Sequence, residues 1–276
     1  MKFTTLFLFV LFLNTSFSQV LVSGKVLDSE SKITIPFVNI GVKGKSIGTV
    51  SGPDGRFELD IKKLENVVTF SAIGFATKSI SGKDLKASGN VNLTPKNYQI
   101  ETIEISSKGL GEEQMFGVKN ETRGKSIGFG SSLLGTEFGA PIKIVKPTYI
   151  KSANFVINHA KGDSMFFRIN IYKFQDGKIG ENILKENILI MRKQEKGTVT
   201  IDLSAYNIVL ESDVLLALEW IKDDNGKGNI GLTFDTKKGK KIKGVYLKHT
   251  SMSEFNRLSY KRSLNPCFYF IGKQEL

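Results

Sequence analysis

Apolar and polar residues alternate with a period of two along most of the chain after residue 20, which is the period of a half-buried strand. The segment 36–42 shows the pattern clearly. Its predicted core face carries Val38, Ile40 and Val42. Its opposite face carries Phe37, Asn39 and Gly41. Farther along, Phe57, Leu59 and Ile61 are predicted to point inward in the same way.

Turn signals divide this alternation into short segments. Pro53-Asp54-Gly55 is a strong turn signal, because proline and glycine favour backbone angles that turns require. Between residues 20 and 105 the alternation gives about seven short strands, spaced roughly ten residues apart, without a helical period. This spacing is typical of a small β-sandwich, which we assign to residues 19–105.

The segment 147–276 alternates as strongly and predicts a larger sandwich of about eight strands, related to a jelly roll. The expected strands are 149–157, 164–174, 186–191, 197–203, 214–222, 229–234, 245–249 and 267–271. Between the two sandwiches, the glycine-rich segment 106–146 is expected to be a linker and lead-in segment, in which 112–117 forms one helical turn or none. The predicted fold class is therefore all-β, with two β-sandwiches.

Two faces of the second sandwich raise the question of ligand binding. Val214, Leu216, Leu218 and Trp220 share one face, so Trp220 is predicted to be a core residue. The alternative is an exposed tryptophan that stacks on sugars. Tyr172 shares a face with more mixed neighbours, and we expect this face to be exposed. These neighbours are Phe166, Arg168 and Asn170.

The N-terminus has the pattern of an export signal. Lys2 precedes an apolar run, 3–13, that is interrupted only by two threonines. The run is far shorter than the roughly 20 residues that span a bilayer. Ser16 and Ser18 have the small-x-small spacing that signal peptidase recognises, so we expect cleavage after Ser18, which makes 1–18 a signal peptide. An uncleaved anchor or a buried strand is the alternative. We expect no transmembrane helix in the mature chain.

Several linked motifs occur in the first predicted sandwich. They are Val22-x-Gly24-x-Val26-x-Asp28, Ile35-Pro36-Phe37-Val38-Asn39-Ile40, Gly48-Thr49-Val50-Ser51-x-x-Asp54-Gly55-x-Phe57 and Phe70-Ser71-x-Ile73-Gly74-Phe75. Through these motifs, residues 20–105 resemble the carboxypeptidase D regulatory-like domain. The resemblance implies a transthyretin-like sandwich of seven strands without catalytic residues of its own. The segment 167–220 resembles an uncharacterised β-sandwich domain that follows such regulatory-like domains in exported bacterial proteins. It also has a loose resemblance to galactose-binding-like jelly rolls, from which no binding residue is carried over.

Composition limits the chemistry. The chain has two histidines, His159 and His249, and one cysteine, Cys267, which are too few for a Cys/His zinc site, a disulfide framework or an iron–sulfur cluster within one chain. We therefore expect no metal, no cofactor and no catalytic residue. His159, in a polar segment, is interpreted as solvated rather than catalytic. Cys267 has aromatic neighbours and is interpreted as a small buried residue, with an intermolecular disulfide or a reactive thiol as alternatives.

Positive charge is concentrated in the second half. Residues 19–105 hold 11 basic and 9 acidic residues, whereas residues 106–276 hold 27 and 18. A run of five lysines forms the densest cluster: Lys237, Lys238, Lys240, Lys241 and Lys243. This run is either a candidate site for an anionic polymer or a solvated hairpin tip. An exported protein is not expected to bind nucleic acid, so envelope polysaccharide, lipopolysaccharide or another surface protein is the expected partner.

Together these patterns predict an exported, non-enzymatic envelope or cell-surface protein that acts as a binding or scaffold module. It is expected in the periplasm, in association with the outer membrane, or outside the cell. The alternative is a secreted hydrolase, or a carbohydrate-binding accessory protein, with its site in the second sandwich.

Overall fold

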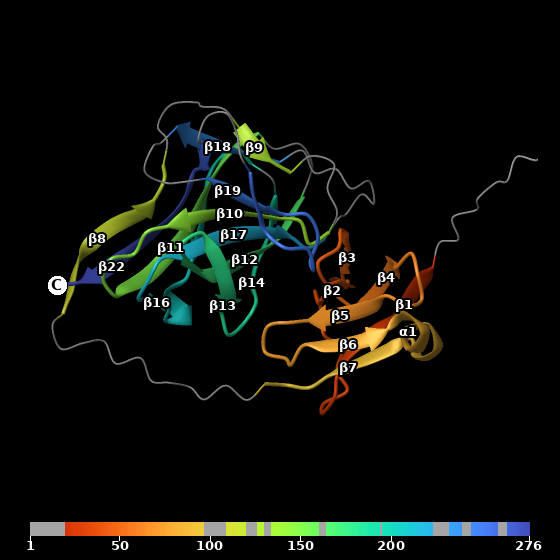
Figure 1. The fold of residues 1–276 in the computed structure, drawn as a ribbon. Coiled ribbons are helices and arrows are strands. Elements are labelled where there is room, and N and C mark those ends of the chain that lie inside the picture. Colours follow the sequence, from red (N-terminus) through yellow and green to blue (C-terminus); the bar gives the residue numbers. More distant parts are fainter. Residues whose placement is uncertain are drawn as a thin grey trace, which may run out of the picture.

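The computed structural model describes residues 20–96, 109–119, 126–129, 134–159, 164–193, 195–222, 232–238, 244–258 and 264–276. These residues form an N-terminal unit (20–96) and a larger C-terminal unit (109–276), which lie side by side (Figure 1). Both are built from strands, which confirms the predicted all-β class. In the described part of the chain, no helix is both long and apolar enough to cross a membrane.

The N-terminal unit is a sandwich of two small sheets. One has the strand order β4 (Arg56–Asp60), β1 (Leu21–Asp28), β7 (Asn90–Leu93). The other has the order β3 (Ile47–Val50), β2 (Asn39–Val42), β5 (Val67–Ser71), β6 (Lys78–Ser81). β1 and β7 are parallel, and the other pairs are antiparallel.

The core of this unit follows the alternation in the sequence. Val38 and Ile40 are fully buried, and Phe57, Leu59 and Ile61 lie in the same cluster. These inward positions are therefore confirmed. The sequence pattern did not predict helix α1 (Gly82–Ser88), which contributes the buried Leu85 to the cluster. The helix is too short to show a period, and its signal is local, because the Ser81 hydroxyl accepts a hydrogen bond from the backbone N–H of Asp84 at 3.1 Å.

The C-terminal unit has two larger sheets. The seven-stranded sheet has the order β13 (Lys178–Asn182), β12 (Ser164–Gln175), β17 (Val214–Trp220), β10 (Glu137–Ile142), β19 (Val245–Lys248), β20 (Asn256–Leu258), with β14 (Ile188–Lys193) also paired with β12. The eight-stranded sheet has the order β21 (Leu264–Pro266), β18 (Thr233–Lys238), β11 (Thr148–His159), β22 (Phe268–Glu275), β8 (Leu110–Gly117). Three short strands are added to it: β9 (Ser126–Gly128), β15 (Gly197–Asp202) and β16 (Val209–Leu210). A 3-10 turn, η1 (Ser204–Tyr206), lies between β15 and β16.

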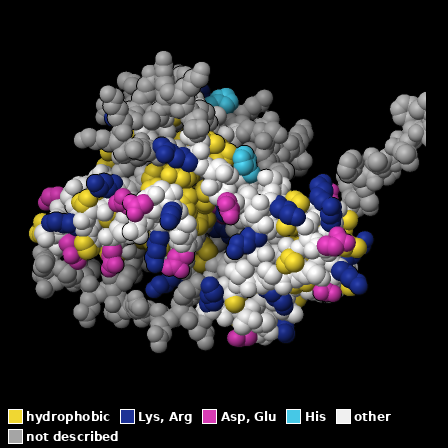
Figure 2. All heavy atoms as spheres, viewed as in Figure 1, with side chains coloured by type: hydrophobic (Ala, Val, Ile, Leu, Met, Phe, Trp, Pro, Cys, Tyr) yellow, Lys and Arg dark blue, Asp and Glu magenta, His cyan; other side chains and the backbone are white. Residues whose placement is uncertain are grey.

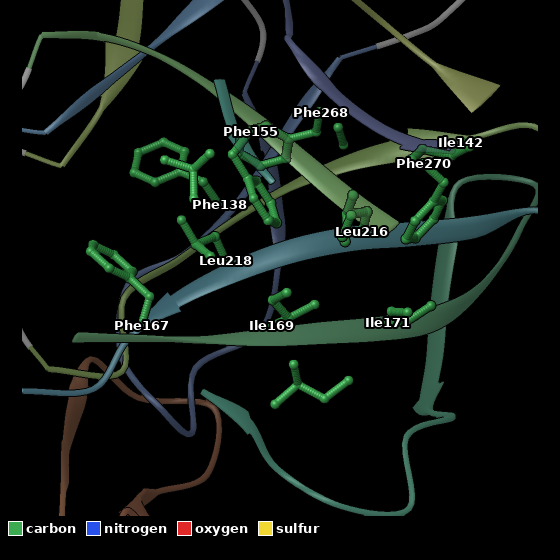
Figure 3. Close-up of a cluster of buried hydrophobic side chains, with 14 of the residues drawn as sticks. Phe138, Ile142, Phe155, Phe167, Ile169, Ile171, Leu216, Leu218, Phe268 and Phe270 are labelled. Atoms are coloured by element: carbon green, nitrogen blue, oxygen red, sulfur yellow. The ribbon is translucent and has the colours of Figure 1, made fainter. Parts of the chain in front are cut away.

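The main hydrophobic core lies between these two sheets. Figure 3 shows side chains from β10, β12 and β17 facing Phe155 of β11 and the phenylalanines of β22. Leu216, Leu218 and Trp220 belong to this core, as predicted from their shared face. Trp220 is only 1% exposed, and its indole N–H donates to the carbonyl of Lys222 at 2.6 Å. Trp220 is therefore not available to stack on a sugar.

The segment 106–146 differs from the expected linker. It contributes β8, β9 and β10 to the sheets of the C-terminal unit, and residues 112–117 lie in β8, antiparallel to β22, instead of forming a helical turn. Cys267, between β21 and β22, is fully buried against Val118, Val156 and Tyr269, which confirms its interpretation as a buried residue.

Candidate functional site

Four charged residues form a row across four neighbouring strands of the seven-stranded sheet. Arg168 on β12 is the register partner of Glu219 on β17, Glu219 is the partner of Glu137 on β10, and Glu137 is the partner of Lys248 on β19. Their neighbours along the strands, such as Ile169 and Leu218, point into the core. Because side chains alternate between faces, the charged row lies on the opposite, outer face of the sheet. We call these four residues the charged row.

The first pair in the charged row is a deeply buried ion pair. The side chains of Arg168 and Glu219 are 2% and 0% exposed. Nε and Nη2 of Arg168 each lie 2.9 Å from Oε2 of Glu219. Within the described part of the chain, Oε1 of Glu219 is buried and has no hydrogen-bond partner. The carboxylate thus depends on interactions at one oxygen for most of its stabilisation.

The second pair is bound to the first through an amide. Nδ2 of Asn170 donates to both Glu137 and Glu219, at 2.8 Å each. Glu137 also accepts from Lys248 Nζ at 2.8 Å and from the Tyr172 hydroxyl at 3.1 Å. The row therefore has two cations and two carboxylates in one connected hydrogen-bond network, with a balanced charge when all four are ionised.

Burial and charge act in opposite directions on these groups. Burial raises the pKa of Glu137, and the nearby Glu219 carboxylate adds to this, although Lys248 opposes it. Burial also disfavours ionised Glu219, yet Arg168, Lys248 and the hydrogen bond from Asn170 together lower its pKa. Burial, followed by the two carboxylates, raises the pKa of Tyr172 well above its usual value. The Glu219–Arg168 pair is thus the more firmly ionised part of the row.

The charged row reaches into the N-terminal unit through Arg168. Its Nη1 donates to the backbone carbonyl of Phe37 at 2.8 Å, and its Nη2 donates to Oδ1 of Asn39 at 2.7 Å. Nη1 also donates to Oδ1 of Asn187 at 3.1 Å. One guanidinium therefore connects a buried carboxylate of one unit with two groups of the other, which uses the planar fork of donors that arginine provides.

Apolar side chains close the same contact. Phe37 and Val50 of the N-terminal unit pack with Ile221, which follows β17, and Phe37 is only 6% exposed. Phe37 has a φ of 53°, in the left-handed region that a phenylalanine rarely adopts. Phe37, which precedes β2, and Val50 at the end of β3 are thus covered by the second unit.

The loop between β19 and β20, residues 249–255, provides the second part of the contact, and we call it the strap. Ser251 Oγ lies 2.7 Å from the carbonyl oxygen of Ile40 and 2.9 Å from that of Thr49, so its single proton is shared between two acceptors. The N–H of Gly44 donates to the carbonyl of Met252 at 3.1 Å. These contacts bind the strap to the β2–β3 hairpin.

An aromatic layer continues from the charged row along the outer face of the sheet. It consists of the buried Leu215, Ala217 and Tyr246 and the half-buried Tyr172, Phe174, Ile179 and Phe255. Lys248 Nζ lies 5.3 Å from the ring centroid of Phe255, and the rings of Phe255 and Tyr172 pack edge-on with centroids 5.4 Å apart. Figure 2 shows hydrophobic side chains gathered on the C-terminal unit beside its boundary with the N-terminal unit.

The expected exposure of the face around Tyr172 is wrong. Arg168 and Asn170 are 1% and 2% exposed, and Tyr172 is half-buried. The N-terminal unit and the strap cover this face, and strand alternation carries no information about a second covering layer. The sequence of β17 nevertheless contains a signal for this buried charge. Six of its seven residues are apolar, the seventh is Glu219, and all seven are buried. A single acid in a strand that is apolar on both faces indicates a buried partner charge.

The sequence candidates lie elsewhere. His159, at the end of β11, and His249, directly after β19, are both exposed and do not belong to the charged row. Lys237 is exposed in β18, and Lys238 is the register partner of Leu264. The rest of the lysine run, Lys240, Lys241 and Lys243, lies outside the described residues. In the described part of the chain, no group of three or more His, Cys, Asp or Glu side chains is arranged to hold a metal ion.

Comparison with known proteins identifies the N-terminal unit. Residues 22–106 match the CarboxypepD_reg-like domain, which confirms the resemblance carried by the motifs. The TonB-dependent receptor P3 of Formosa agariphila is 34% identical over 90 residues, which are 33% of this chain and 9% of the receptor. The chain thus matches less than a tenth of the length of this curated relative. The solved structure of infectious bursal disease virus Gx strain aligns over 92% of this chain and 63% of its own, with 9% identity and a TM-score of 0.18, which is too low to indicate a shared fold.

Proposed function

We propose that this protein is an exported, non-enzymatic protein of the cell envelope or cell surface that acts as a binding or scaffold module. The observation that carries the proposal is the use of its buried charged groups. Arg168 binds both Glu219 and the N-terminal unit, and Glu137 and Lys248 bind each other. Through Arg168, this buried network joins the two sandwiches, which is the role expected of a scaffold.

The comparisons support the same proposal. A CarboxypepD_reg-like domain occupies the N-terminal third of the chain, and the similar segment of the relative belongs to a protein named as a receptor. An envelope location also agrees with the signal pattern of residues 1–18. The competing function is a secreted hydrolase or a carbohydrate-binding accessory protein.

The location is tested by mass spectrometry of fractionated cells. We expect the mature N-terminus at Gln19 in the envelope or medium. Leu8→Arg, which places a charge in the apolar run 3–13, is the control that should block processing. Recovery of the wild-type chain with Met1 intact in the cytoplasmic fraction would contradict export.

The non-enzymatic role is tested by a screen of the purified mature protein against peptides, esters and glycans. We expect turnover no faster than the buffer rate. The variants His159→Ala and His249→Ala are included because histidine is the side chain most often used for general acid–base catalysis near neutral pH. Turnover that disappears in either variant would establish the hydrolase alternative.

A further inference from the structure

The residues that carry the family resemblance also make the contact between the two units. The motif segments 35–40 and 48–51 supply Phe37, Asn39, the carbonyls of Ile40 and Thr49, and Val50. The presence of apolar residues at Val38 and Ile40 is explained by core packing, because both side chains are fully buried inside the N-terminal unit. The outward groups of the same segments meet the C-terminal unit instead. We call this outward surface, residues 37–50, the docking face.

The docking face lies close against the strap. A Cβ atom at Gly48 would lie 2.8 Å from Ser251 Oγ and 3.0 Å from both Cβ and Oγ1 of Thr250. These neighbours all belong to the strap, and both residues are buried. The absence of a side chain at Gly48 thus makes room for the strap of the C-terminal unit, not for a residue of the N-terminal unit. The docking face therefore fits a short polar loop with hydroxyl side chains, here the strap, next to a sheet that carries an arginine, here Arg168.

The far end of the strap covers the charged row. Phe255 packs against Tyr172 and lies over Lys248, whose side chain is 9% exposed and bound to Glu137. The strap is therefore held at residues 250–252 by the N-terminal unit and ends on the aromatic layer. Lys248 directly precedes the strap and Phe255 is the last residue of the strap, so the docked residues, the lysine and its cover all lie within residues 248–255. A displacement of residues 250–252 is therefore transmitted within a single short loop.

We propose that the N-terminal unit clamps the strap, so that docking of the docking face and closure of the strap over Lys248 are a single event. In the docked state the Glu137–Lys248 pair is shielded from water. In the undocked state the strap loses its hydrogen bonds to Ile40, Thr49 and Gly44, and the pair becomes accessible. The CarboxypepD_reg-like domain then controls access to a charged and aromatic surface of its neighbour.

The test uses the mature full-length chain and the variant Gly48→Val. Valine suits a β-strand, and the three atoms nearest to its Cβ all belong to the strap, so the N-terminal unit is expected to fold. Gly180→Val on the exposed edge strand β13 is the matched control, since its Cβ lies nearest to Lys173. Hydrogen exchange of peptides from β1 and β5 reports whether the N-terminal unit stays folded, and peptides from 36–50 and 249–255 report docking.

Closure is measured by acetylating surface amines at low conversion and quantifying each lysine by mass spectrometry. In Gly48→Val we expect the strap to exchange faster and Lys248 to be labelled roughly tenfold faster than in the wild type, as for a locally opened segment. Lys86 of α1, which is exposed, should react equally in all proteins and serves as the internal standard. Gly180→Val should behave as the wild type.

Two outcomes contradict the proposal. If Gly48→Val exchanges at 36–50 and 249–255 as slowly as the wild type, the close contact at the docking face is not required for docking. If these segments open while Lys248 stays as protected as before, docking and closure are separate. Should Gly48→Val unfold β1 and β5, Ser251→Ala replaces it, because this variant removes the shared hydroxyl from the strap and leaves the N-terminal unit unchanged. The same two readouts then decide.

Discussion

Arg168→Met would remove the guanidinium that joins the two units while keeping a long, apolar side chain in its place. The change deprives Glu219 of its hydrogen bond and ion pair with arginine and leaves it with Asn170 as its remaining hydrogen-bond donor among the described residues. It also removes the donors to the Phe37 carbonyl and to Asn39. The arginine is therefore expected to be among the residues whose loss destabilises the protein most.

The magnitude follows from burial. Breaking a buried ion pair by removing one partner costs about 3–5 kcal/mol, because an uncompensated charge remains in a low-dielectric environment. Glu219 is 0% exposed, so solvent screening does not reduce this figure. The two acceptors in the N-terminal unit add to the loss, but contributions within one network are not additive. We expect a loss of about 4 kcal/mol, which lowers the Tm of a protein of this size by on the order of 10 °C.

The assay is urea unfolding followed by the fluorescence of Trp220, the one tryptophan of the chain, which is buried next to Glu219 in β17. Glu219→Leu and the double variant Arg168→Met/Glu219→Leu complete a double-mutant cycle. The double variant should recover much of the loss, since an apolar pair replaces a buried ion pair at little cost. Lys173→Met is the control: its pair with Glu181 is more than 60% exposed on both sides, so its loss should leave the urea midpoint nearly unchanged.

The pH dependence gives an independent check of the same reasoning. In the wild type the pKa of Glu219 is lowered in the folded state, so its contribution to stability is present above the unfolded pKa and is lost as the pH falls through the folded pKa. Without Arg168, burial dominates and raises this pKa, so acid protonates the orphaned carboxylate and relieves the variant. The deficit of Arg168→Met should therefore shrink as the pH is lowered. A deficit below about 1 kcal/mol at pH 7, or one that grows in acid, would refute the argument.

Two further predictions concern Tyr172 and the lysine run. Tyr172→Phe removes the hydroxyl bonded to Glu137 and should cost about 1 kcal/mol at pH 7. Because burial raises the pKa of Tyr172, the wild type should lose this advantage as the pH rises past the usual tyrosine value of 10.0, and urea unfolding at pH 8 and 10.5 checks it. For the lysine run, binding of the wild type to lipopolysaccharide or acidic polysaccharide should weaken with salt and be lost when the five lysines become glutamine. These are Lys237, Lys238, Lys240, Lys241 and Lys243. Equal binding by wild type and variant, or none by either, would leave the run a solvated segment.

The sequence predicted the strands and the core well, because alternation reports directly which side of a strand is buried against its own sheet partner. Val38, just before β2, and Ile40 within it point inward as their spacing indicates, and so do Leu216 and Leu218 on β17. The local pattern was less informative where strands are short or come from an irregular, glycine-rich stretch. β8 and β10 were missed for this reason, since 106–146 has many glycines and little alternation.

The charged row could not be assembled from the sequence. Its members lie at positions 137, 168, 219 and 248 and meet only because β12, β17, β10 and β19 are neighbours in the sheet. The strand order of an antiparallel sandwich is set by long-range packing, which leaves no local trace. The burial of this row depends in addition on the packing of a second unit against the sheet. A strand with Arg168 and Asn170 on one face therefore has the sequence pattern of a solvated strand, although the N-terminal unit covers it.

The backbone at Phe37 offers a test of how firmly the docking face is built. Phe37 has a φ of 53°, and its ring packs against Val50 and Ile221. Phe37→Ala and Phe37→Gly both lose the ring, which should cost about 3–5 kcal/mol, but only glycine adopts this backbone conformation without strain. We therefore expect the glycine variant to be the more stable of the two by about 1 kcal/mol in urea unfolding followed by circular dichroism. At Phe57, a buried residue of β4 with ordinary strand backbone, the order should reverse, since glycine in a strand is usually less stable than alanine. If alanine is the more stable variant at both positions, residue 37 does not require the left-handed backbone conformation when the two units are docked.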